Sequence, residues 1–154
     1  MNPLEQFEAE KKARVAVLTE DMAIRERSRD WMVASAPHGY TYNFTWLGIP
    51  VIQFPQDLVA LQEVIWATRP DLIVETGVAH GGSLIFSASI LEMLGGGGRV
   101  VGVDIDIRDQ NRVQLEVHPL FKRIELIEGD SVSEPVVAQV RQLAVDCERV
   151  LVIL

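Results

Sequence analysis

The sequence predicts an α/β fold in which helices cover both faces of a parallel sheet. The prediction rests on an alternation beyond residue 70, where four short apolar runs are separated by stretches long enough for crossover helices. Strands that are buried on both faces read as continuous apolar runs, and they need helices above and below the sheet. The runs are residues 72–74, 100–103, 124–127 and 150–154.

The composition is that of one globular domain. The 154 residues are 48% apolar and 23% charged, and the formal net charge is −8. No apolar run approaches the ~20 residues that span a bilayer, and the charged N-terminal residues do not resemble a signal peptide, so we expect a cytoplasmic protein without a membrane span. The acidic balance without a basic stripe argues against nucleic acid as a partner. Cys147 is the single cysteine, which excludes an intrachain disulfide.

The first 30 residues predict one densely charged helix. They contain six basic and seven acidic residues, so this block is almost neutral and the rest of the chain carries most of the negative charge. Five apolar residues fall near one helical stripe, which would pack on the main domain or on a second copy of the protein. They are Leu4, Phe7, Val15, Leu18 and Met22.

Residues 36–55 predict an ordered loop or short edge strands, because glycines and prolines interrupt helical continuity there. Four aromatic residues at alternate positions would lie on one face if the segment were extended. They are Tyr40, Tyr42, Phe44 and Trp46. We therefore expect an N-terminal part, residues 1–54, made of the helix and this loop, followed by a sheet domain over residues 55–154.

Helices are expected before and between the strands. An amphipathic pattern predicts one over about residues 56–68, which Pro70 ends. The other expected helical segments are residues 83–94, a segment around 109–118, and residues 134–146.

Acidic residues follow the first three predicted strands. Glu75 ends the first, Asp104 the second and Asp130 the third. In an open parallel sheet the ligand lies beyond the carboxyl ends of the strands, so these side chains should meet at one site. Asp104, 27 residues after Gly77, is placed to accept both hydroxyls of a ribose. Asp130, followed by Ser131, could accept from an exocyclic amine such as that of adenine, so the three acids together predict a nucleoside site.

The turn after the first predicted strand consists mostly of small residues. They include Gly77, Ala79, Gly81, Gly82 and Ser83. Gly77 and Gly81 allow a tight turn and a close approach to a ligand. Gly82 and Ser83 open a helix whose free N–H groups favour an anionic group such as a carboxylate. His80 in this turn either contacts the ligand or caps the turn.

The choice of nucleoside depends on the same turn. A dinucleotide fingerprint reads Gly-x-Gly-x-x-Gly, but Ala79 stands where its second glycine is expected. The order Glu-x-Gly-x-Ala-x-Gly at residues 75–81 instead resembles the first motif of a class I methyltransferase, which binds S-adenosylmethionine. Two alternatives stay open: an NAD(P)-dependent oxidoreductase, and a non-catalytic nucleoside-binding or assembly module.

Three stretches make the resemblance more specific. They are Tyr-Asn-Phe-Thr-Trp-Leu-Gly at 42–48, Gln-x-Pro-Gln-Asp-Leu at 53–58, and residues 70–83. From about Gly39 to its end the chain resembles the cephalosporin hydroxylase and rhamnosyl O-methyltransferase family. This resemblance implies a Rossmann-like, oligomeric O-methyltransferase that uses S-adenosylmethionine, often with Mg²⁺, on hydroxyls of antibiotic or glycolipid precursors. It also implies that Glu75 binds the cofactor's methionine amino group, Asp104 its ribose and Asp130 its adenine.

The same resemblance exposes a departure from the family pattern. In relatives the strand matching residues 150–154 is interior to the sheet, and a metal-binding aspartate, further acidic ligands and three more strands follow it. The sequence ends at Leu154. We therefore expect a sheet truncated after the fourth strand, an exposed apolar edge, and no metal ligands in this chain. The catalytic residues and the methyl acceptor are not assigned.

Overall fold

The computed structural model describes residues 2–154 and divides the chain into two compact units between Tyr40 and Thr41. This division differs from the boundary after residue 54 that the sequence suggested, because residues 41–54 belong to the same unit as the sheet. No helix among the described residues combines the length and the apolar character that crossing a membrane requires.

The helical unit contains two helices, α1 (Pro3–Glu20) and α2 (Met22–Ser35), followed by a short 3₁₀ turn at Ala36–His38. The expectation of one helix is therefore wrong. Asp21 interrupts it with an extended backbone (φ −78°, ψ 92°), and its side chain accepts from the N–H of Ile24 at 3.0 Å, which caps the start of α2. Aspartate is a favoured N-cap residue, so the break is encoded locally.

The sheet unit begins with a hairpin. Strands β1 (Phe44–Trp46) and β2 (Ile49–Val51) pair in antiparallel fashion. The hairpin agrees with the ordered loop or short strands expected for residues 36–55. The extended backbone that would place four aromatic rings on one face begins only at Phe44, because Tyr40 to Asn43 form a 3₁₀ turn. Phe44 and Trp46 pack against the core, with the rings of Trp46 and Phe86 4.8 Å apart, whereas Tyr42 is 67% exposed.

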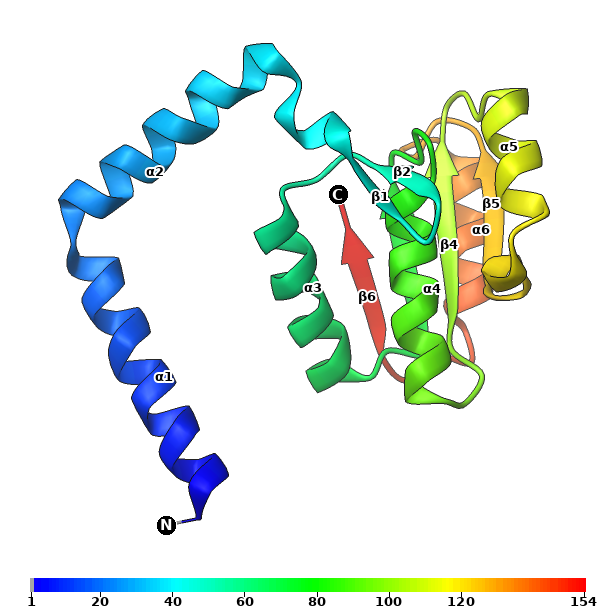
Figure 1. Cartoon of the computed structure of the whole chain (residues 1–154). Helices are drawn as coiled ribbons and strands as arrows, with labels where there is room; N and C mark the ends of the chain where they lie inside the picture. The colour runs from blue at the N-terminus through cyan, green and yellow to red at the C-terminus, as the bar shows by residue number, and fades with distance from the viewer. Residues whose placement is uncertain (1) are drawn as a thin grey trace. The chain divides into compact units, whose positions relative to one another are not determined.

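The main sheet confirms the predicted α/β class. Its strands are β3 (Leu72–Thr76), β4 (Arg99–Asp104), β5 (Ile124–Glu128) and β6 (Val150–Ile153). All neighbours are parallel, in the order β5-β4-β3-β6 (Figure 1). Numbered along the chain within this sheet, the order is third, second, first and fourth strand. Strand β6 forms one edge of the sheet, with Val150 and Val152 about half exposed.

Helices cover the two faces of this sheet. They are α3 (Pro55–Thr68), α4 (Gly82–Leu94), α5 (Asp109–Glu116) and α6 (Glu134–Ala144). One apolar cluster joins Ile73 and Val100 of the sheet to α3, α4 and the β1–β2 hairpin. A second cluster joins the opposite side chains of the sheet, such as Val74 and Val101, to α6. Burial on both faces explains why the strands are continuous apolar runs.

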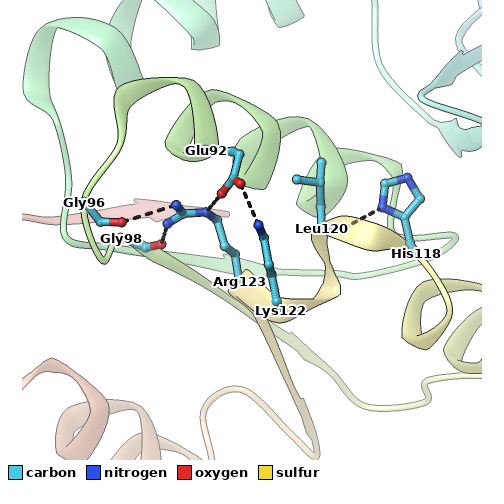
Figure 2. Close-up of polar contacts among 7 residues, drawn as sticks. All are labelled: Glu92, Gly96, Gly98, His118, Leu120, Lys122 and Arg123. Atoms are coloured by element: carbon cyan, nitrogen blue, oxygen red, sulfur yellow. Dashed lines mark hydrogen bonds and ion pairs between the residues drawn. The ribbon is translucent and has the colours of Figure 1, made fainter.

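The connection from α4 to β4 is held by Arg123, which lies in the 3₁₀ turn Pro119–Arg123. Its guanidinium donates to the carbonyl oxygens of Gly98 at 2.7 Å and Gly96 at 3.2 Å, and it also binds the Glu92 carboxylate (Figure 2). Lys122 Nζ reaches the same carboxylate at 2.6 Å. The hydrogen bonds from Lys122 and Arg123 lower the pKa of Glu92. Arg123 thus fixes a glycine-rich loop that has little packing of its own.

Replacing Arg123 by alanine should destabilise the chain more than replacing Lys122. The Arg123 side chain is only 15% exposed and holds two backbone carbonyls, so Arg123→Ala should cost about 1–2 kcal/mol of unfolding free energy. Lys122 is 61% exposed, and Lys122→Ala should change little. Urea denaturation followed by circular dichroism measures both, and equal effects of the two variants would contradict this account.

Candidate functional site

Two adjoining cavities open at the carboxyl ends of the parallel strands. The first, of about 160 Å³, lies between the β3–α4 loop, the residues that follow β2, and the end of β6. The second, of about 370 Å³, lies between the same loop and the residues that follow β4. Ile52, Ala79 and His80 line both cavities. The fold therefore places a ligand-sized space where open parallel sheets bind their ligands.

The β3–α4 loop forms the wall between the two cavities, and its backbone is unusual. Gly77, Ala79 and Gly81 have positive φ angles of 90°, 48° and 84°. Alanine rarely adopts a positive φ angle, and at Ala79 hydrogen bonds to both the backbone N–H and the carbonyl stabilise this conformation. The Ala79 N–H donates to Asp104 Oδ2 at 3.2 Å, and its carbonyl accepts from Asn111 Nδ2 at 2.7 Å.

Gly81 and Gly82 have a packing role as well as a place in the first cavity. A Cβ on Gly82 would lie 2.2 Å from the carbonyl oxygen of Pro50, and a Cβ on Gly81 would lie 2.5 Å from Leu115 Cδ1. The start of α4 therefore rests directly on the backbone of β2. This close contact brings the residues that follow β2 to the edge of the first cavity.

Glu75 is a buried acid in the first cavity, with only 4% of its surface exposed. Ser83 Oγ, on the first turn of α4, donates to Oε1. Oε2 is buried without a partner among the described residues. Burial raises the pKa of Glu75 to about 7, although the Ser83 hydrogen bond works in the opposite direction. The carboxyl group is therefore poised between its neutral and charged forms near neutral pH.

Gln53 supplies a second acceptor to the same cavity. Its Oε1 atom is buried and, like Glu75 Oε2, has no hydrogen-bond partner among residues 2–154. A buried acceptor left without a donor costs about 1–3 kcal/mol. No lysine or arginine is among the residues lining this cavity. Two such oxygens, one of them a carboxylate, suit a ligand that brings several donors and a positive charge.

Asp104 lines the second cavity, and its carboxylate also organises the loop beside it. Oδ2 accepts from the N–H groups of Val78 at 2.7 Å and Ala79 at 3.2 Å, and Oδ1 accepts from Asp106 at 3.2 Å. Burial raises the pKa of Asp104, but the backbone donors outweigh it and the net shift is downward. A ligand hydroxyl would thus meet a charged carboxylate whose two oxygens already accept from the backbone.

Asp130 and Ser131 are exposed, and neither is among the residues that line the two cavities. Asp130 Oδ1 accepts from the Val132 N–H at 3.0 Å, which forms a turn before α6. The end of β5 is nevertheless tied to the end of β4, since Gly129 donates its N–H to the Asp104 carbonyl at 2.8 Å. The other seven predicted site residues gather around the first two strand ends.

The structure adds residues that the sequence did not assign to the site. Gln53 lines the first cavity, and Asn111, Arg108 and Asp106 line the second, together with Tyr42 from the aromatic segment. No local pattern marks them, because their position depends on contacts between distant segments. The exception is Gln53, which lies inside one of the family-like stretches.

Metal-ligating groups do not cluster in the part of the chain that is described. Within residues 2–154, no three His, Cys, Asp or Glu side chains lie close enough together to hold a metal ion. His118 instead has a structural role. Its Nδ1 accepts from the Leu120 N–H at 3.2 Å and caps the following 3₁₀ turn (Figure 2).

The sheet order and the cleft at its strand ends define a class I methyltransferase fold. An apo-structure of CmcI aligns with a TM-score of 0.56 at 22% identity, covering 72% of this chain and 45% of that one. A CmcI structure with Mg-SAM aligns with a TM-score of 0.51 at 22% identity, covering 68% of this chain and 52% of that one. These likenesses concern the fold alone.

The particular family follows from the sequence comparison. The family model for Rhamnosyl O-methyltransferase/CmcI matches residues 38–154, and the chain belongs to this family. A Rhamnosyl O-methyltransferase from Mycobacterium leprae (strain TN) is 30% identical over 99 residues, which are 64% of this chain and 41% of that protein. The chain thus spans less than half the length of this relative.

The raised pKa of Glu75 predicts a pH-dependent stability. Its value of about 7 in the folded chain exceeds the ordinary 4.5, so the folded state keeps a proton that the unfolded state releases. The stability that this proton provides is present below pH 4.5 and is lost as the pH rises through 7. Glu75→Gln, which stays neutral, should therefore be more stable than the parent above pH 7 by about 3 kcal/mol, with the gain vanishing near pH 4.5.

Urea midpoints measured across this pH range test the expectation. Glu116→Gln, at an exposed position on α5, is the matched control and should follow the parent at every pH. If the Glu75→Gln chain showed the same pH dependence as the parent, the buried carboxyl would not be the titrating group.

Proposed function

We propose that this chain forms the cofactor-binding part of an S-adenosylmethionine-dependent O-methyltransferase. The observation that carries the proposal is a pair of buried oxygens, Glu75 Oε2 and Gln53 Oε1, that have no hydrogen-bond partner within residues 2–154 and lie in a cavity adjoining the one lined by Asp104. Family membership and the CmcI structure with Mg-SAM support it. The chain spans only part of the length of its relatives. The methyl-transfer activity of the whole enzyme is therefore also a proposal.

The donor-acceptor chemistry of the site fits this cofactor. Its methionine end carries an ammonium group with three donors and a positive charge, which would satisfy Glu75 and Gln53. A cation beside Glu75 favours the charged carboxylate and opposes the effect of burial on its pKa. Ser83 keeps the other carboxylate oxygen in place through its hydroxyl.

The nucleoside end of the cofactor fits the second cavity. Asp104 has a lowered pKa, so its carboxylate stays charged and would accept from a ribose hydroxyl. The positive φ angles of Gly77 and Ala79 turn the loop so that its backbone would lie close to the ribose. Asp130 and Ser131, at the end of β5, would contact the adenine. His80 lines both cavities and would lie beside the junction of the methionine and the nucleoside.

When bound, S-adenosylmethionine supplies a methyl group on a positively charged sulfonium, ready for transfer to a nucleophilic oxygen. The residues of this chain contribute orientation and exclusion of water, because the loop and the Glu75 carboxyl are held in fixed positions. We propose a hydroxyl of a small natural product or glycolipid precursor as the acceptor, with a cytoplasmic, homo-oligomeric enzyme as its setting. Residues 2–154 contain no cluster of three His, Cys, Asp or Glu side chains, so this proposal assigns no Mg²⁺ ligand among them.

Calorimetric titration with S-adenosylhomocysteine tests cofactor binding. The parent chain should bind it, and Glu75→Gln should weaken binding about tenfold or more, because a carboxylate–ammonium contact is lost. Asp104→Ala should weaken binding to a similar extent. Asp104→Asn keeps an acceptor for the loop N–H groups. Comparing it with Asp104→Ala therefore distinguishes the loss of the ligand contact from a change in the conformation of the loop.

Asp146→Ala, at an exposed position after α6, is the matched control and should bind like the parent. NADH should not compete with S-adenosylhomocysteine or raise the melting temperature. Failure of the folded parent to bind, or undiminished binding by both Glu75→Gln and Asp104→Ala, would overturn the assignment.

A further inference from the structure

Within the helical unit, the apolar side chains of α1 and α2 do not cover one another. Neither α1 nor α2 contains a buried residue, and large apolar residues such as Leu4 (69%), Phe7 (53%) and Val33 (66%) are exposed. An isolated helix as short as α2, with 14 residues, is marginal in water, and two helices without a shared core gain little stability from each other. The pair therefore needs a further surface to pack against.

A groove between the two helices offers one such surface. It has a volume of about 660 Å³ and lies between the second half of α1 and the length of α2. Its apolar lining residues are Val15, Leu18, Ile24, Met32 and Val33. The charged residues in its lining are Arg25 and Arg29, and no carboxylate is among them. The groove thus fits an apolar segment that carries negative charge.

The first half of α1 has this character. Leu4 and Phe7, three residues apart, lie on one side of the helix, and residues 3–10 carry three carboxylates and no basic residue. They are Glu5, Glu8 and Glu10. The charge and the apolar pattern of this segment are complementary to the groove.

The segment cannot enter the groove of its own chain. Helix α1 is continuous from Pro3 to Glu20, and the groove is built on the second half of this same helix. Figure 1 shows the first half of α1 leading away from the corner where α1 and α2 meet. Occupation of the groove by residues 4–10 therefore requires a second molecule.

The distribution of charge favours a second copy of this chain as that molecule. The first 30 residues hold six basic and seven acidic residues, whereas the whole chain has a net charge of −8. Two copies meet with least repulsion through this almost neutral part. The family match begins at residue 38, so α1 and α2 lie outside the region that matches the family model.

We propose that two copies of the chain associate through the helical unit, with Leu4 and Phe7 of each copy seated in the α1–α2 groove of the other. Glu8 and Glu10 then face Arg25 and Arg29 across a two-fold axis, so each copy makes the same contacts. This interface does not depend on the proposed methyltransferase site, which lies in the sheet unit.

Sedimentation equilibrium of the full chain with reversed charges tests this interface. The parent should be a dimer. Arg25→Glu/Arg29→Glu and Glu8→Lys/Glu10→Lys should each raise the dimer dissociation constant about tenfold or more, since like charges then face each other. An equimolar mixture of the two variants should recover the dimer, because both contacts in the mixed pair again join opposite charges. Arg141→Glu, on α6 of the sheet unit, is the control and should leave association unchanged.

The recovery in the mixture distinguishes the interface from a folding defect, because a variant that failed to fold would not be rescued. A monomeric parent at every concentration would overturn the proposal. So would a dimer that persists in both charge variants, which would place the contact elsewhere, for example at the β6 edge. The same variants should bind S-adenosylhomocysteine as the parent does. The experiment thus distinguishes a failure of the proposed interface from a failure of the proposed cofactor site.

Discussion

The carboxylate of Asp104 is the contact on which the geometry of the site depends. It binds the N–H groups of Val78 and Ala79 and so holds the β3–α4 loop in a conformation that alanine rarely adopts. Its backbone carbonyl accepts from Gly129, which ties the end of β5 to the end of β4. Asp104 therefore connects the ends of three neighbouring strands. It also fixes the β3–α4 loop, which separates the two cavities.

Burial and hydrogen bonding give the two acids of the cleft opposite electrostatic behaviour. Glu75 is buried and accepts from one hydroxyl donor, so desolvation raises its pKa, whereas Asp104 receives several backbone donors and its pKa falls. The cleft thus combines an acid that gains most from a cationic ligand with an acid that stays charged. A zwitterionic amino acid joined to a nucleoside presents both kinds of partner.

The sequence predicted the sheet well because its signals are local. Apolar runs and a proline that ends the preceding helix predicted the parallel strands and the helices between them, and acids that follow the first two runs predicted the position of Glu75 and Asp104. The predicted continuity of the first helix failed at Asp21, whose side chain caps a new helix. The aromatic alternation at residues 40–46 did not decide between a loop and short strands, and the structure contains both, a 3₁₀ turn at Tyr40–Asn43 followed by a strand at Phe44–Trp46.

The sequence by itself determined the class of fold, the order of the acids and the family, because these depend on periodicity and on residues adjacent in the chain. The tertiary structure decided which groups share a cavity. Gln53 and Asn111 join the site through close contacts between segments distant in sequence, such as Gly82 against Pro50 and the Asn111 amide against Ala79. That Glu75 Oε2 has no partner among the described residues is likewise decided by the tertiary structure, because burial and the geometry of every nearby donor determine whether an acceptor is satisfied.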